Sequence, residues 1–471
     1  MTENYTKADL DAVFGEDSLG STPEQRAQTS KAVFVRSQLQ LTFDSPGANG
    51  RRLSAQEALR IFGWEMLRKV GQDESVPLLR SSQEPARTLK KRRIELGLGT
   101  NAVARHAGIT ETELINSETP GRLSPIRLLE SVAQSLALDE RRLGFEPNAG
   151  ADDKLGVRLR EIADQGGPHH FSEATVMQLT EAAWVVSRQH ELQCLVEKAF
   201  PEAVPLPKYD DRYSYPVYNI GYQLARRTRS ILHLGEEQPI DSVRELVERR
   251  FGIPLVQERI NQRFAGATIA NGSARGIVVN EQGLNSNVWV RRMTLAHELG
   301  HLLWDPDEKL ESVRVDAYED VEQNERTVRR DPAEIRANAF AIAFLAPPTA
   351  VARIAKNSSY PEDAIVTVAQ KYGISITAAR YHISNATGQD MPADLQIPRT
   401  DPDQSWEVSE NRTLDYFPIA ETPITRRGMF AWYVAQMQAK NLISLDTAAT
   451  YLKAPLENLG ARLRQVLELQ G

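Results

Sequence analysis

The chain has 471 residues, of which 41% are hydrophobic and 25% charged, the usual proportions for a soluble globular protein. The net charge of −7 argues against a protein that coats nucleic acid through a broadly basic surface, but it leaves room for a local basic patch. The single cysteine, Cys194, excludes an intrachain disulfide and a structural zinc site built from cysteines.

The length predicts several domains, because domains average roughly 150 residues. No apolar run approaches the ~18 residues of a membrane-spanning helix, and the first residues, MTENYTKADL, are too polar for a signal peptide. We therefore expect a cytoplasmic protein without a membrane partner. The expected fold class is α+β, mostly helical and multidomain.

Residues 1–85 begin with a polar stretch, continue through a turn-rich stretch at 45–50 and become amphipathic at 53–70. This pattern predicts an accessory helical segment that is partly disordered at its start. The segment offers no residue pattern with a recognisable chemistry.

Residues 86–147 predict an all-helical domain. Its first three helices are expected at 87–98, 101–109 and 110–118, with a tight turn at Gly108 and Thr110 as the N-cap of the third helix. Two helices joined in this way form the helix-turn-helix unit, whose second helix enters the DNA major groove.

The same residues resemble the lambda-repressor-like (Xre) family. The resemblance rests on Leu89, Arg92, Gly97, Leu98, Ala104, Gly108, Ile109 and Thr110. It implies DNA contacts from the following four polar residues: Thr100, Thr110, Thr112 and Asn116. However, Thr100 stands where the family usually has a glutamine. The presumed recognition helix also carries Glu111, Glu113 and Glu118, which phosphates repel. Sequence-specific DNA binding and a helical domain for dimerisation or for docking a related repressor both remain open.

Residues 148–235 predict a helical linker. It contains two helices between 158 and 200, a connector at 201–216, and His169 and His170 in a loop, which makes them poor metal ligands. We interpret Cys194, on the second helix, as a small core residue.

Residues 236–391 predict a small sheet followed by a helix with a metal-binding pattern. Strands are expected at 251–260, 265–270 and 275–280, the last two as a hairpin. The helix MTLAHELGHLLW then places His297 and His301 four residues apart, so that both imidazoles can reach one metal ion. Glu298 points about 100° away from His297 around the helix and is the expected general base toward a zinc-activated water.

Catalytic zinc takes three protein ligands, so a third ligand is expected downstream. A charged loop offers eight carboxylates, most of which we interpret as solvated: Asp307, Glu308, Glu311, Asp316, Glu319, Asp320, Glu322 and Glu325. Glu334 is the better candidate. It opens an apolar helix capped by Asp331 and shares a face with Asn338, where a buried carboxylate needs a cation as its partner.

Three segments together resemble the ImmA/IrrE family of metallopeptidases across roughly residues 236–390. They are RRMTLAHELGHLLWDP, EIRANAFAIAFLAPP and AIVTVAQKYGISITAARYHISNATG. The resemblance implies a zincin-like domain in which His297, His301 and Glu334 hold Zn²⁺ and Glu298 is the base. His382, in the third segment, is interpreted as structural. Fusion to an Xre-like module implies a stress-response, prophage or phage-defence regulator that cleaves an Xre-type transcriptional repressor.

Two further interpretations concern regulation. The protein could instead be a DNA-binding transcription regulator whose zinc domain is a sensor without proteolysis. The thiolate of Cys194 could also occupy the open position of zinc and hold the enzyme inactive. Residues 392–471 predict a C-terminal helical segment whose apolar residues form core or an oligomer contact, the latter implying a homodimer. They are Phe430, Trp432, Tyr433, Met437, Leu442 and Leu445.

Overall fold

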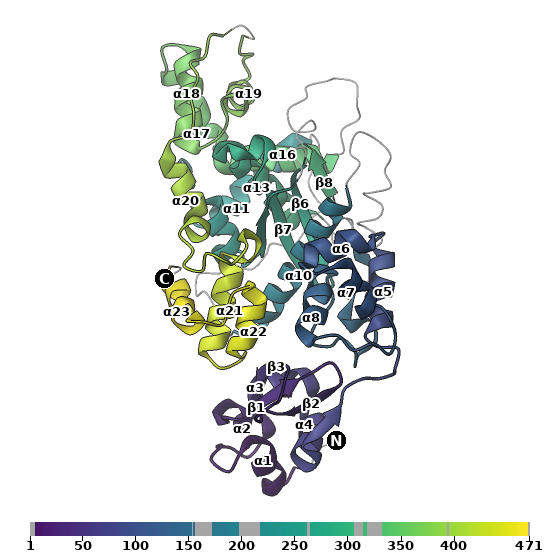
Figure 1. Ribbon diagram of the computed structural model, residues 1–471. Coiled ribbons are helices and arrows are strands. Elements are labelled where there is room, and N and C mark those ends of the chain that lie inside the picture. Colours follow the sequence, from purple (N-terminus) through teal and green to yellow (C-terminus); the bar gives the residue numbers. More distant parts are fainter. Residues whose placement is uncertain are drawn as a thin grey trace. The chain divides into compact units, whose positions relative to one another are not determined.

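The structure, a computed structural model, describes residues 5–152, 154–155, 172–196, 217–260, 264–305, 314–317, 332–392 and 395–469 (Figure 1). The chain forms two compact units. Unit 1 comprises Met1–Asp164, His170–Leu192 and Phe417–Gly471, and unit 2 comprises Gln165–His169 and Gln193–Tyr416. The described part is dominated by helices and contains two four-stranded sheets. The expected mostly helical α+β fold is therefore confirmed.

Some predicted features lie outside the described residues. They are the first helix expected after residue 158, the connector 201–216, His169 and His170, the cap Asp331 and the carboxylates between Asp307 and Glu325, of which Asp316 has a described backbone only.

The N-terminal segment of unit 1 is an α+β arrangement. Its helices are α1 (Lys7–Phe14), α2 (Pro23–Thr29), α3 (Ala55–Phe62) and α4 (Trp64–Asp73), and its strands are β1 (Val33–Arg36), β2 (Gln40–Phe43), β3 (Arg51–Ser54) and β4 (Ser75–Pro77). The strands form an antiparallel sheet in the order β3-β1-β2-β4. Phe34, Leu41 and Leu53 from the sheet and Leu67 from α4 are buried together.

The expectation of a purely helical segment here was wrong, because the sheet escaped the sequence pattern. Strands of three or four residues are too short for a clear alternation, and two buried positions carry arginines. Arg51 pairs with Glu130 at 2.8 Å, and Arg36 donates to the backbone oxygens of Glu140 and Leu143, each at 2.7 Å. Buried charges of this kind are paired and hydrogen-bonded, but in the sequence they look like surface residues.

The next four helices of unit 1 are α5 (Ala86–Glu95), α6 (Thr100–Ala107), α7 (Glu111–Ser117) and α8 (Ile126–Ser135). The predicted turn and cap are confirmed. Gly108 has a φ of 70°, a left-handed conformation that favours glycine, and Thr110 forms a reciprocal capping box with Glu113. The sequence therefore predicted the succession α6, turn and α7 correctly.

The rest of unit 1 consists of α10 (Glu173–Cys194), η4 (Ile424–Arg426), α21 (Met429–Ala439), α22 (Leu445–Leu452) and α23 (Leu459–Leu469), with the short 3₁₀ turn η1 (Pro147–Gly150). Buried ion pairs join these segments: Glu181 of α10 accepts from Arg426 at 2.7 Å and from Lys453 at 2.8 Å. Phe430 and Tyr433 are almost fully buried, as the core interpretation predicts.

Unit 2 contains the second sheet. Its strands are β5 (Leu255–Glu258), β6 (Phe264–Asn271), β7 (Ala274–Asn280) and β8 (Arg314–Ala317), in the order β5-β7-β6-β8. The predicted hairpin of β6 and β7 is confirmed, with Ala267 opposite Val278 and a left-handed glycine, Gly272, at the turn. β5 runs parallel to β7 and β8 antiparallel to β6.

Helices and helical turns make up the other described elements of unit 2. They are α11 (Val217–Ile231), α12 (Val243–Glu245), the π-helical turn η2 (Leu246–Arg250), η3 (Gly283–Ser286), α13 (Val288–Trp304), α16 (Pro332–Leu345), α17 (Pro348–Asn357), α18 (Pro361–Tyr372), α19 (Ile376–Thr387) and α20 (Gln404–Asp415). α13 packs on β6 and β7, and α16 packs on both α13 and α11 (Figure 1).

Glycines permit the close approach of α16 to its two neighbours. A Cβ at Gly300 of α13 would lie 2.8 Å from the ring of Phe340, and one at Gly221 of α11 would lie 2.5 Å from the backbone oxygen of Arg336. Both contacts are closer than a side chain tolerates. The two glycines therefore fix α16 against α13 and α11, and this packing positions the site described below.

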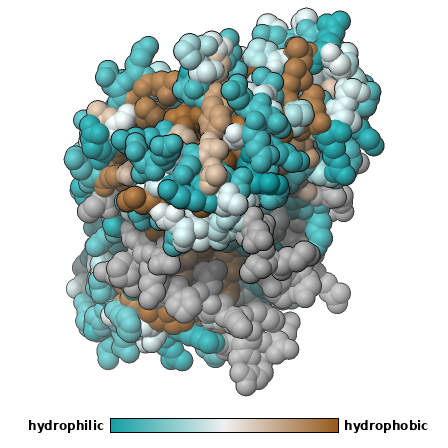
Figure 2. Space-filling model, turned by 90° about the horizontal axis from the view of Figure 1, so that it is seen from below, coloured by the Kyte–Doolittle hydropathy of each residue, from teal (hydrophilic) through white to brown (hydrophobic). Residues whose placement is uncertain are grey.

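Within the described residues, no helix combines the length and the apolar character needed to cross a bilayer by itself. α16 and α17 are long and apolar enough only when they are counted as one helix, and a bend of 60° separates the two. On the face shown in Figure 2, hydrophobic residues occur in small groups among hydrophilic ones.

Candidate metal centre

Two histidines of α13 form the first part of the centre. Asn287 is the N-cap of this helix, and its side chain accepts a hydrogen bond from the backbone N–H of Trp289 at 2.9 Å. The helix is buried along most of its length. His297 and His301 lie one turn apart with ring centroids 4.7 Å from each other. Their exposed fractions are 4% and 2%, so both imidazoles need partners inside the protein.

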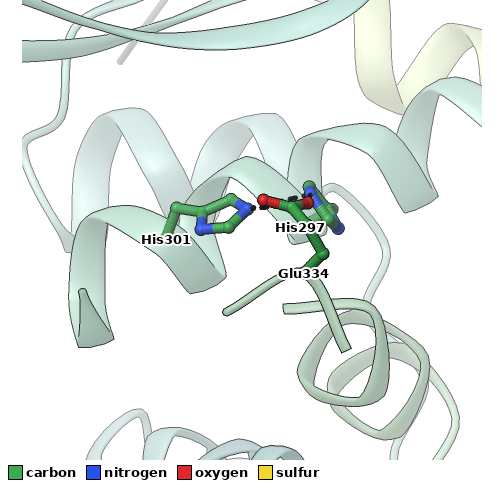
Figure 3. Close-up of side chains that lie close together, drawn as sticks. All are labelled: His297, His301 and Glu334. Carbon is green, nitrogen blue, oxygen red and sulfur yellow. Dashed lines mark hydrogen bonds and ion pairs between the residues drawn. The ribbon is translucent and has the colours of Figure 1, made fainter. Parts of the chain in front are cut away.

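α16 brings Glu334 to the two imidazoles (Figure 3). Its Oε2 lies 3.4 Å from Nε2 of His297 and 3.5 Å from Nε2 of His301, and the two Nε2 atoms are 3.0 Å apart. Tetrahedral zinc with bonds of about 2.0–2.1 Å separates its ligand atoms by about 3.3 Å. The triangle of donor atoms therefore has the size that zinc requires, and the group can hold a metal ion.

The hydrogen bonds of the outer ring nitrogens support the same conclusion. Nδ1 of His297 lies 2.9 Å from Oδ1 of Asn338, and Nδ1 of His301 lies 2.9 Å from Oδ2 of Asp305. Both partners are acceptors, so each Nδ1 carries a proton and each Nε2 turns a lone pair inward. Two lone pairs and a carboxylate then face one another, an arrangement that a cation stabilises.

The charges of the centre shift in the directions that this arrangement predicts. Burial opposes ionisation of Glu334, but hydrogen bonds with His297 and His301 outweigh it and hold its pKa well below the ordinary range. Burial likewise disfavours the charged form of His301, but hydrogen bonds with Asp305 and Glu334 raise its pKa. Both shifts favour a positive charge next to the carboxylate of Glu334, which is what a divalent cation would supply.

A second layer of side chains holds the histidines in place. The side chain of Asp305 is 2% exposed and forms an ion pair with Arg336 of α16, in addition to its bond with His301. α16 thus provides Glu334, Arg336 and Asn338 within two turns. The sequence analysis missed the positioning role of Asp305, although this residue follows His301 by four positions at the C-cap of α13, a spacing that indicates contact.

Glu298 faces strand β6 rather than the ligand triangle. Its exposed fraction is 1%, and a Cβ at Gly266 would lie 2.9 Å from its Oε1 and 3.1 Å from its Cγ. Only glycine at position 266 leaves room for this carboxylate. Glu298 and His297 both line a cavity of about 650 Å³, so the carboxylate can reach a molecule bound beside the ligand triangle.

Residues 248–384 match the family model of the IrrE N-terminal-like domain, Peptidase_M78. The match covers less than a third of the chain and includes α13 and α16 entirely, hence all three candidate ligands and Glu298. It indicates a metallopeptidase. No protein in the curated collection matches the chain.

The residues predicted to contact DNA belong to unit 1, outside the matched residues 248–384. The hydroxyl of Thr100 donates to Glu111, Thr110 is engaged in the capping box, and Asn116 accepts a hydrogen bond from Arg122. Thr112 is exposed on α7. The match does not extend to residues 86–147, so their DNA contacts stay a prediction.

Two single residues complete the comparison with the sequence predictions. The interpretation of Cys194 as a core residue was wrong, because it is exposed at the end of α10, two residues past the buried Leu192. The metal-ligand group within the described residues consists of His297, His301 and Glu334, without Cys194. His382 is buried and hydrogen-bonded at both ring nitrogens, in agreement with its interpretation as structural.

Proposed function

We propose that the protein is a zinc endopeptidase that cleaves an Xre-type transcriptional repressor and thereby derepresses stress, prophage or defence genes. The triangle of His297, His301 and Glu334 is the observation that supports this proposal, because its size and donor chemistry suit zinc. Its position inside the region that matches a peptidase family model is the second support.

When bound, zinc would polarise a carbonyl group and lower the pKa of a water molecule. The remaining chemistry belongs to the chain. Glu298 takes the proton of the attacking water and delivers it to the amine that leaves when the peptide bond breaks. Asp305 and Asn338 keep the imidazoles oriented, so that no reorganisation is needed during the reaction. Burial of Glu298, Asp305 and the two imidazoles strengthens their electrostatic interactions.

The choice of a repressor as substrate rests on unit 1. We interpret the succession of α6, turn and α7 as a helix-turn-helix, which would bring the peptidase to a related protein or to DNA where such a protein is bound. The alternative, a DNA-binding regulator with a zinc sensor, draws on the same helices. We favour the peptidase because α7 begins with two glutamates and three of the four polar residues expected to contact DNA are hydrogen-bonded within the chain.

The decisive experiment is co-expression of the chain with the Xre-type repressor encoded nearest to its gene. The wild type should shorten the repressor, and Glu298→Gln should leave it intact while retaining one zinc per chain in elemental analysis. Glu334→Gln should lose both zinc and cleavage. Glu362→Gln, the same change in the first turn of α18, serves as the matched control. Cleavage by the Glu298→Gln variant would refute the proposed mechanism, and an intact repressor with the wild type would refute the proposed substrate.

A further inference from the structure

The cavity beside the candidate metal centre is lined mainly by residues of four helices of unit 2. α13 and α16 contribute residues at helical spacing, α11 contributes Tyr218 and Tyr222, and α19 contributes the stretch from Thr377 to Asn385. One part of its lining contains His297, Glu298 and Asn338. The cavity is therefore continuous with the proposed catalytic site.

The walls formed by α13 and α16 are largely apolar. Val290 and Met293 of α13 and Ile335 and Ile342 of α16 line the space, and Ala339 leaves room between them. Met293 and Ile342 are only partly buried, and both pack against the hydrophobic core at their base. Covering such an apolar surface with another apolar group lowers the free energy by roughly 25 cal/mol per Å² of buried area.

The wall formed by α11 and α19 is mixed. Tyr218, Tyr222 and Tyr381 supply aromatic rings, and Thr377, Arg380, Ser384 and Asn385 supply polar groups. Nε2 of His382 lies 2.7 Å from the backbone oxygen of Ala346, which can only accept, so the proton is on Nε2. Nδ1 of His382 therefore accepts a hydrogen bond from the hydroxyl group of Tyr222, with 3.1 Å between the oxygen and the nitrogen. Burial lowers the pKa of His382 to about 4 and raises that of Tyr222 to about 12, so both stay neutral at pH 7. The hydroxyl group of Tyr222 therefore donates to His382 within the protein, and the side chain of Tyr222 borders the cavity.

We propose that this cavity binds a large apolar side chain of the substrate, of the size of Leu, Met or Phe, in the residue next to the scissile bond, and that Ile342 and Tyr222 limit the size of that side chain. The inference rests on the proposed peptidase function. A volume of about 650 Å³ falls in the range of pockets that enclose ligands larger than one side chain. The neighbouring residue of the peptide therefore fits as well, and charged side chains at these positions lose their hydration against apolar walls.

The experiment measures binding rather than turnover. Full-length protein carrying Glu298→Gln, loaded with zinc and immobilised, is exposed to a random library of blocked hexapeptides, and the retained peptides are sequenced by mass spectrometry. Retained peptides should be enriched in Leu, Met and Phe at one position. The added change Ile342→Phe should reduce that enrichment about 10-fold or more, the discrimination that hydrophobic pockets achieve, and Ile342→Ala should extend it to Trp.

Ile354→Phe on α17 is the matched control, because Ile354 is also partly buried against the same core but does not line the cavity. Peptides retained by the Glu298→Gln protein with the added change Ile354→Phe should show the same enrichment in Leu, Met and Phe as those retained by Glu298→Gln alone. No retained peptides, no preference for large apolar residues, or a preference unchanged by Ile342→Phe would each overturn the inference. Apolar enrichment without repressor cleavage by the wild type would support the inference and refute the proposed substrate, so the two failures are distinguishable.

Discussion

Replacing Asp305 with alanine removes the carboxylate that orients His301. The side chain of Asp305 is 2% exposed, its Oδ2 lies 2.9 Å from Nδ1 of His301, and its other oxygen pairs with Arg336. A hydrogen bond that involves a charged group contributes about 1.5–3 kcal/mol. Since each 1.4 kcal/mol corresponds to a factor of ten, zinc should bind about 10–100-fold more weakly, the loss typical for removal of such an outer partner.

The assay is competition for zinc with a chromophoric chelator at pH 7, with each variant also unfolded by urea in the absence of metal. Asp305→Asn keeps an acceptor for His301 without the charge, and its loss of affinity should be intermediate. Asp363→Ala, at an exposed position in α18, should bind zinc like the wild type. Wild-type zinc affinity in a folded Asp305→Ala protein would refute the positioning role of this carboxylate.

Three further predictions concern Gly266, His382 and Glu191, the last of which lies on α10. Gly266→Ala should leave the zinc affinity unchanged but reduce kcat by about 10–100-fold, because the added Cβ displaces the carboxylate of Glu298. A kcat equal to that of the wild type would show that the added Cβ does not displace this carboxylate. Burial lowers the pKa of His382 to about 4, so the unfolded chain takes up a proton near pH 6.5 before the folded chain does. The free energy of unfolding should therefore fall between pH 6.5 and 4, and His382→Gln should flatten that slope. Burial opposes ionisation of Glu191, but Arg188 and its neighbours lower its pKa to about 2. In urea unfolding at pH 7 the wild type should therefore be more stable than Glu191→Gln. This difference in the free energy of unfolding should be lost as the pH falls from about 4.5 through 2.

Local patterns were sufficient to predict the elements that carry the metal centre. The i, i+4 spacing of His297 and His301 requires only that α13 be a helix, and the alternating residues of β6 and β7 with a glycine between them specify a hairpin. Glu334 could be chosen from many carboxylates because it opens an apolar helix, where a charge needs a partner.

Other parts of the structure depend on contacts between distant segments, which no local pattern encodes. The pairing of Arg336 with Asp305 requires the approach of α16 to α13. The N-terminal sheet is stabilised by ion pairs such as Arg51 with Glu130, which lie 79 positions apart in the sequence (130 − 51). One wall of the cavity combines Tyr222 with His382, and neither residue type in isolation distinguishes a cavity wall from ordinary core.

The non-contiguous composition of unit 1 affects the order in which the protein can fold during synthesis. Gln193–Tyr416, the main part of unit 2, is translated before Phe417–Gly471, which supplies Arg426 and Lys453 to the buried Glu181. Domains fold as units while the chain emerges from the ribosome. Unit 2 can therefore mature first, whereas Glu181 of α10 has His106 but neither Arg426 nor Lys453 as a partner until the last helices have been made.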